Sequence, residues 1–148
     1  MYEECYIDFE LAQRLKQTGF PQHKSLTTYF VGDDKKRGCE VGELIHHKSE
    51  ESDTHLIDAP TQDALCRWLR DTQGIDILVD VVEHSIKLKS GCYYRYRIYK
   101  KRKYIEDDDD YLYETYDKAV AAALRKIFKK YKGYKLDYER EKDTHYGL

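Results

Sequence analysis

Apolar side chains recur at the three- and four-residue spacing of an α-helix in three parts of the chain. The first helical segment opens at Asp8, a good N-cap residue, and ends before Gly19, which readily takes the left-handed conformation of a helix end. The second starts around Pro60 and ends at Gly74, and the third starts after Thr115. Each segment has one apolar face and one polar face, so we expect three helices that pack against other elements.

The apolar faces of the second and third helical segments supply the expected core. Trp68 is the largest side chain on these faces, so its truncation should lower the free energy of unfolding by about 3–5 kcal/mol. Ala64 belongs to the same stripe of the second segment. The residues expected to be buried in one cluster are Leu65, Trp68, Leu69, Val120, Leu124, Ile127 and Phe128.

Runs rich in β-branched and aromatic residues predict strands between the helices. The predicted strands are residues 26–31, 39–46, 54–57, 75–82 and 92–99. Ser90–Gly91 indicates a turn between the last two. Strands joined as hairpins and interrupted by helices are typical of an α+β fold, here a mainly antiparallel sheet with about three helices packed against it. We place this single domain at residues 1–136 and expect a loosely ordered tail at residues 137–148, where apolar content is low.

The overall composition limits the classes of function. The net charge of −2 gives no global attraction to nucleic acid or to a membrane surface, so such binding would need a local patch. The opening residues, MYEECYIDFE, have neither a basic nor an apolar segment, and no run is apolar enough for a membrane span. The four cysteines are scattered without a metal-type spacing. We therefore expect a cytoplasmic protein with four free thiols and no membrane contact.

Several segments of the chain are similar to a group of small bacterial proteins. These segments are DFELAQRLKQTGF near the start, APTQDALCRWLRDTQGIDI in the middle, and YETYDKAVAAALRKIF after a tyrosine-rich strand. Across residues 8–130 the chain resembles small proteins of gut Bacteroidales that are often found in phage or mobile-element regions. The resemblance implies no activity, and it supports only the fold and a cellular context.

Tyrosine is unusually abundant, with 15 among 148 residues, and it suits contact surfaces because its ring is apolar and its tip is polar. Alternation along the predicted strand 92–99 places tyrosines and arginines together on one face. The third helical segment carries lysines on its outer face. If the two faces adjoin, they form a phosphate-binding patch; the simpler interpretation is that both are solvated. The candidate binding residues are Tyr93, Arg95, Arg97, Tyr99, Lys126 and Lys130.

Other clusters carry weaker signals. The acids at residues 106–110 are contiguous and lack the alternation of a calcium loop, so we predict a solvated loop that offsets the basic run before it. Neither Cys66 nor Cys92 opens a helix, where a thiol would be activated, and no nucleotide or nucleophile motif is present. We predict no metal, no cofactor and no enzyme activity. Zinc-ligand residue types without the spacing of a zinc motif occur at Cys39, His46, His47 and His55.

Without a catalytic motif, the sequence favours binding over catalysis. The leading prediction is a small accessory protein of phage or mobile-element type that acts by protein–protein contacts. Its partner is unknown, and self-association is one option. The alternative prediction is a nucleic-acid-binding module that uses the Tyr/Arg strand and the basic helix. A continuous positive surface would favour nucleic acid, whereas a flat tyrosine-rich surface would favour protein.

Overall fold

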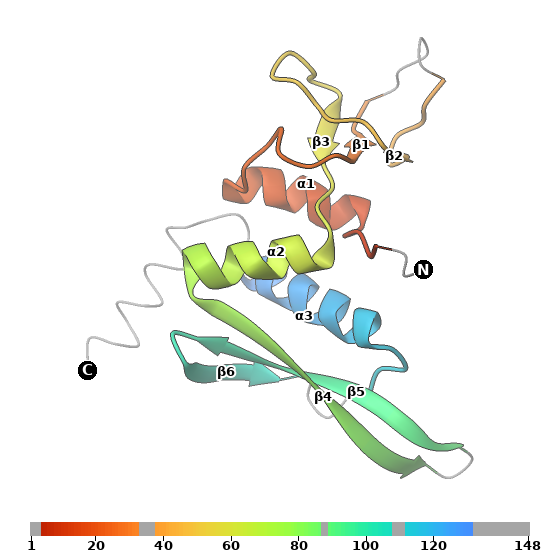
Figure 1. Cartoon of the computed structure of the whole chain (residues 1–148), viewed down its shortest axis with the longest axis vertical. Helices are drawn as coiled ribbons and strands as arrows, with labels where there is room; N and C mark the ends of the chain where they lie inside the picture. Colours follow the sequence, from red (N-terminus) through yellow and green to blue (C-terminus); the bar gives the residue numbers. More distant parts are fainter. Residues whose placement is uncertain (1–3, 33–37, 87–88, 108–111, 132–148) are drawn as a thin grey trace. The chain divides into compact units, whose positions relative to one another are not determined.

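A computed structural model of the chain describes residues 4–32, 38–86, 89–107 and 112–131 (Figure 1). These residues contain three α-helices, one π-helical turn and six strands. The α+β class predicted from the sequence is confirmed. The strands form two antiparallel three-stranded sheets, however, and not the single sheet that we expected.

The chain folds into two compact units, each built from two stretches of sequence. The first unit is Met1–Cys5 with Thr61–Lys126, and the second is Tyr6–Pro60 with Ile127–Leu148. The single domain at residues 1–136 stays a prediction, and the predicted tail at residues 137–148 lies outside the described residues.

The second unit contains one helix and a sheet of short strands in the order β2-β1-β3 (Figure 1). β1 pairs antiparallel with both neighbours. All residues of β1 and β3 are buried, so these strands form the centre of the unit. The elements are α1 (Phe9–Thr18), β1 (Thr28–Phe30), β2 (Leu44–Ile45) and β3 (Leu56–Asp58).

The ends of α1 follow from local chemistry. The side chain of Asp8 accepts a hydrogen bond from the backbone N–H of Leu11 at 2.8 Å, which satisfies a donor that the helix leaves free. Gly19 ends the helix with φ of 86°. This left-handed conformation is unfavourable for any residue that has a Cβ atom, but not for glycine. Both ends lie where the sequence predicts them.

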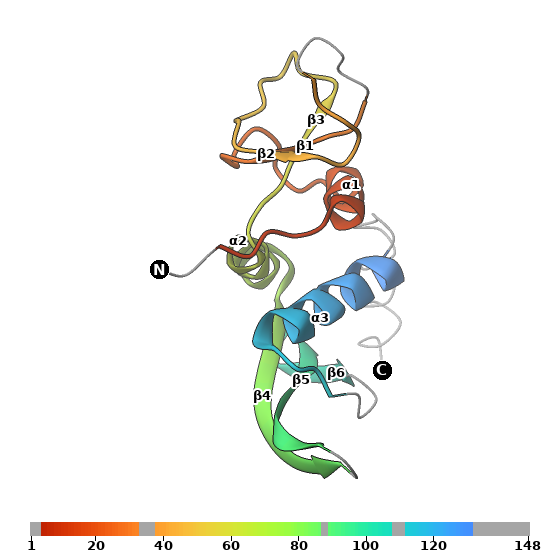
Figure 2. The same ribbon diagram turned by 90° about the vertical axis from the view of Figure 1, so that its right-hand side faces the viewer.

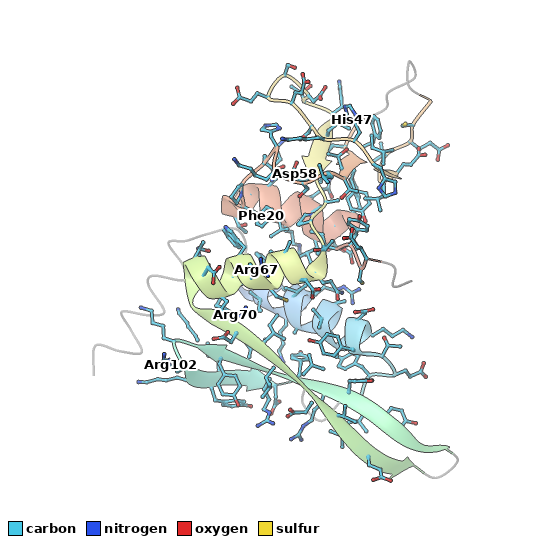
Figure 3. The ribbon with its side chains drawn as sticks, in the orientation of Figure 1. Phe20, His47, Asp58, Arg67, Arg70 and Arg102 are labelled. Carbon is cyan, nitrogen blue, oxygen red and sulfur yellow. The ribbon has the colours of Figure 1, made fainter. Side chains whose placement is uncertain are left out.

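A buried carboxylate, that of Asp58, connects three segments of the second unit (Figure 3). Its Oδ2 accepts hydrogen bonds from the backbone N–H groups of Lys24 and Ser25, both at 2.9 Å. Its Oδ1 accepts the hydroxyl of Ser49 at 3.0 Å, and the Oγ of Ser49 lies 2.9 Å from Nδ1 of His23. Because Asp58 is only 1% exposed, this network replaces the water that the carboxylate loses on folding.

The first unit contains a helix, a π-helical turn, a long antiparallel sheet in the order β4-β5-β6, and most of a third helix. Figure 2 shows α3 lying along one side of this sheet. Gly74 separates the helical segment from the sheet with φ of 66°. The elements are α2 (Gln62–Trp68), η1 (Leu69–Gln73), β4 (Ile75–Ile86), β5 (Lys89–Lys100), β6 (Lys103–Asp107) and α3 (Tyr116–Tyr131).

The buried stripe of α2 and η1 is narrower than predicted. Leu65 and Leu69 are buried, but Trp68 is half-buried and Ala64 is exposed, so their expected burial is wrong. Successive residues of a helix are about 100° apart, so the row that contains Ala64 and Trp68 lies at the border of the stripe centred on Leu65 and Leu69. The four predicted core residues of α3 are each buried: Val120, Leu124, Ile127 and Phe128.

The two long strands extend beyond the predicted ranges. β4 and β5 pair without interruption from Ile75, opposite Lys100, to Ile86, opposite Lys89. The turn predicted at Ser90–Gly91 is therefore wrong, because both residues pair within the ladder. The next connection, between β5 and β6, is a tight two-residue turn, Lys101–Arg102, in which both residues have positive φ.

Within the described residues, no helix is long and apolar enough to cross a bilayer. The longest helix, α3, has 16 residues and carries charged residues near both ends.

Candidate functional site

The two faces of β5 have different environments. Residues directly opposite each other in an antiparallel pair share a face, so Tyr93, Arg95, Arg97 and Tyr99 lie with Val82, Asp80, Leu78 and Asp76 of β4. On the β6 side, Arg97 is opposite Asp107 and Tyr99 is opposite Tyr104. We call this surface the outer face. It comprises Asp76, Leu78, Asp80, Val82, Tyr93, Arg95, Arg97, Tyr99, Tyr104 and Asp107.

The opposite face of the sheet packs against α3. Tyr96 and Ile98 are buried there, and the ring of Tyr94 contacts that of Tyr116 edge-on at 6.1 Å. Tyr113 extends this packing, because it pairs with Tyr94 through two backbone hydrogen bonds of 2.8 Å. Tyr94, Tyr96 and Ile98 therefore have a structural role, and the residues of β5 from Tyr93 to Tyr99 with odd numbers form a surface that α3 does not cover.

Lys126 lies on the α3 side of the sheet and not on the outer face. Its Nζ donates a hydrogen bond to the backbone oxygen of Asp107 at 2.7 Å and stands 6.0 Å from the ring centroid of Tyr96. The proposed patch that joins Lys126 to Arg95 and Arg97 is thus not formed. The side chain of the other candidate on this helix, Lys130, lies outside the described residues.

Carboxylates offset the arginines of the outer face. Arg97 forms an ion pair with Asp80, and the hydrogen bond that its guanidinium donates to this carboxylate raises the pKa of Arg97. Asp76 pairs with Arg70 at 3.1 Å, and Asp107 accepts the hydroxyl of Tyr104 at 2.7 Å. The face therefore mixes the two signs of charge and is not a continuous positive surface.

Arg95 differs from Arg97 because it makes no hydrogen bond or ion pair within the described part of the chain. Its Nε atom, like that of Arg97, is shielded from solvent and has no partner there, and the residue as a whole is half-buried. Leu78 is 43% exposed and Tyr104 is 54% exposed on the same face. Tyr99 and Tyr104 contact each other edge-on, with centroids 6.0 Å apart. This combination of rigid aromatics, arginine and exposed leucine resembles the core of protein interfaces.

The neighbouring strands supply the part of this surface that sequence reasoning missed. Leu78 and Asp80 belong to β4, and Tyr104 belongs to β6. The period of two in residues 75–82 could have indicated Asp76, Leu78 and Asp80 as one face. Their position beside Arg95 and Arg97 depends on the pairing register, which no local pattern gives.

The other candidate clusters do not assemble into a chemical site. Across residues 4–32, 38–86, 89–107 and 112–131, no three His, Cys, Asp or Glu side chains are grouped to hold a metal ion. Of the acidic run, Glu106 and Asp107 belong to β6, and the acids after them lie outside the described residues. Cys5 and Cys66 are free thiols.

The thiol of Cys66 should be poorly reactive in the folded protein. Burial and the charge of Asp63 raise its pKa from 9.0 to about 11, against a smaller opposite effect of Arg70. The reactive form is the thiolate, so alkylation by iodoacetamide at pH 7 should be slow and should rise about tenfold per pH unit toward that pKa. Peptide mass spectrometry after timed alkylation measures this rate, with unfolded protein as the control. A rate at pH 7 equal to that of the unfolded chain would contradict the burial of Cys66.

Comparison with protein-family models, curated proteins and solved structures gives no match for this chain. The resemblance to Bacteroidales phage and mobile-element proteins accordingly stays a prediction. Function is inferred from the chemistry of the outer face.

Proposed function

We propose that this chain is a binding protein that acts through protein–protein contacts made by the outer face. The observation that carries the proposal is the composition of this face, which is partly exposed and rich in Tyr and Arg, with charges of both signs. Tyr and Arg contribute most of the affinity in many protein interfaces, because they bury a large area and still make directed hydrogen bonds. A pleated sheet holds their backbones in place, so little conformational entropy is lost on binding.

Three carboxylates make this face a poor surface for nucleic acid. Asp80 is opposite Arg95, Asp107 is opposite Arg97, and Asp76 is opposite Tyr99 farther along the face; at physiological salt charges interact over about 8 Å. A phosphate backbone laid along β5 would meet both signs of charge. The lysine that could have extended the positive charge, Lys126, is on the other side of the sheet.

The setting that we propose is cytoplasmic, as an accessory protein of phage or mobile-element type. The sequence resemblance supports the phage or mobile-element setting, and the free thiols of Cys5 and Cys66 support a reducing compartment.

The decisive experiment compares two arginine substitutions in the first unit. Arg95→Ala removes the arginine of the outer face that has no ion pair within the described residues, and Arg67→Ala removes an exposed arginine of α2 as a matched control (Figure 3). Proteins retained from host extract by the wild-type chain are identified by mass spectrometry, and the affinity of the recovered partner is then measured by calorimetry. We expect Arg95→Ala to weaken binding at least about tenfold and Arg67→Ala to change it less than about twofold.

Fluorescence anisotropy with a labelled single-stranded oligonucleotide tests the competing function. We expect no binding tighter than about micromolar at physiological salt, because the carboxylates of the outer face repel phosphate. Submicromolar binding that weakens steeply with salt and is lost in Arg95→Ala would replace the protein-binding proposal with a nucleic-acid one. Equal partner affinity of Arg95→Ala and Arg67→Ala would also remove the outer face from consideration.

A further inference from the structure

β4 is an edge strand over its whole length. In the sheet order β4-β5-β6, β5 occupies one side of β4, and no strand of the described chain pairs with the other side (Figure 2). β4 has 12 residues, about twice the length of an ordinary strand. Long edges are templates for pairing with another chain, and most proteins protect them.

Several protective features of natural edges are missing from β4, whose charged residues are the acids Asp76, Asp80 and Glu83. The strand contains no proline and no lysine, and its pairing with β5 has no bulge that would twist the edge away. Leu78 and Val81 are 43% and 61% exposed, so two large apolar side chains lie open on the two faces of this strand.

The hydrogen-bond pattern identifies which backbone groups of β4 face outward. Tyr94 exchanges two hydrogen bonds with Tyr113 on the side of β5 away from β4. Backbone groups alternate along a strand, so the partner of Tyr94, which is Val81, turns its N–H and C=O away from β5. The same alternation turns the backbone groups of Val79 and Ile77 outward. The even-numbered positions have the opposite orientation: the backbone oxygen of Gly74, just before β4, points toward β5 and accepts a hydrogen bond from the backbone N–H of Lys101.

We propose that β4 is a dimerisation edge, at which β4 of one chain pairs antiparallel with β4 of a second copy, with Val79 on the two-fold axis. In this register Val79 pairs with its own copy, and Ile77 pairs with Val81 of the second copy. All three residues have outward backbone groups, so the central part of the contact makes about six backbone hydrogen bonds. An isologous contact of this kind closes as a dimer and leaves no further edge of β4 open.

The charges of β4 are compatible with a second copy in this register. With Val79 on the axis, Asp80 is opposite Leu78 of the second copy and Asp76 is opposite Val82, so no two acids meet. Moving the axis to Leu78 places Asp76 opposite Asp80, and moving it to Asp80 places that residue opposite itself. Like charges directly opposite in a sheet are destabilising.

An axis at Ile77 also keeps the acids apart, but it overlaps only residues 75–79 of the two strands, whereas the axis at Val79 overlaps residues 75–83. An axis at Val81 places Glu83 opposite Val79 in the centre of the contact. The Val79 register therefore combines separated acids, an apolar centre and a long overlap.

Pairing at this edge produces a continuous sheet of six strands with two outer faces in one surface. The inference does not depend on the partner proposed above, because the edge of β4 and the side chain of Arg95 are separate parts of the sheet. Arg95→Ala should therefore leave the dimer intact, and a dimer without any partner for the outer face would refute only the earlier proposal.

Light scattering after size-exclusion chromatography at about 100 µM chain tests the dimer. We expect the wild type at twice the 17.7 kDa mass of the chain and Val81→Lys at the single mass, because a lysine at the edge opposes pairing. Val81→Thr keeps a β-branched side chain and should stay dimeric. Val79→Pro removes an outward N–H that β5 does not use and should also be monomeric. A monomeric wild type, or a dimeric and folded Val81→Lys, would overturn the proposal.

A cysteine pair tests the register. Opposite residues of a hydrogen-bonded pair have Cα atoms about 5.5 Å apart, within the range of a disulfide. Under mild oxidation Val79→Cys should give a covalent dimer well above the wild-type background, whereas Leu78→Cys faces Asp80 of the second copy and should not. Equal cross-linking of both variants, or cross-linking of Leu78→Cys alone, would overturn the placement of Val79 on the axis.

Discussion

Asp58→Ala should lower the free energy of unfolding by at least about 3 kcal/mol. The substitution leaves the backbone N–H groups of Lys24 and Ser25 and the hydroxyl of Ser49 without their acceptor. A buried polar group without a partner costs about 1–3 kcal/mol, and three groups lose theirs at once. Urea denaturation followed by circular dichroism measures the loss.

Asp58→Asn is the matched control for this prediction. Its amide oxygen can accept the two backbone N–H groups, and its amide nitrogen can donate to the Oγ of Ser49, whose own proton then turns to Nδ1 of His23. We expect this variant to lose about half as much as the alanine variant or less. A loss below about 1 kcal/mol for Asp58→Ala would mean that water replaces the carboxylate and that the network contributes little.

Leu65→Ala should lower the free energy of unfolding by about 2–5 kcal/mol. Leu65 is fully buried on α2, so truncation removes apolar contacts and leaves a cavity that rigid neighbours fill only in part. Arg67→Ala, two residues along the same helix and exposed, should change the stability by less than about 0.5 kcal/mol. Similar losses for the two variants would show that α2 frays before the unit unfolds.

Local signals in the sequence were sufficient to locate the helices, because a cap acts within one turn. Asp8, Gly19 and Gly74 mark helix ends in the structure as the sequence indicates. The rotation of a helix about its axis is not local, however. Packing selects Leu65 and Leu69 as the buried row, and the size of Trp68 alone suggested more burial than this side chain has.

The division of the strands into two sheets could not be predicted from local sequence patterns. The three short strands of the second unit contain two or three residues each, too few for a periodicity to be visible. Their pairing joins residues far apart in sequence, such as Tyr29 with Ile57. The network of Asp58 is of the same kind, because Lys24 and Ser49 are each common surface residue types and only the fold brings them to one carboxylate.

The candidate site was predictable in part. Alternation along β5 was sufficient to group Tyr93, Arg95, Arg97 and Tyr99. The neutralising acids could not be assigned without the register between β4 and β5, and Lys126 could not be placed without knowing which side of the sheet α3 covers. The sign of the surface charge therefore had to come from the structure.

The interleaved order of the two units has a consequence for synthesis on the ribosome. Cys5 emerges early, and its backbone oxygen accepts a hydrogen bond from the N–H of Gln62 in α2. That helix is translated only after the whole segment Tyr6–Pro60. At ordinary elongation rates that interval lasts several seconds. The second unit in turn includes Ile127, so it too is incomplete until α3 has left the exit tunnel. Nascent chains stalled before α3 should therefore be sensitive to protease in both units, and neither unit is encoded by one contiguous piece of the gene.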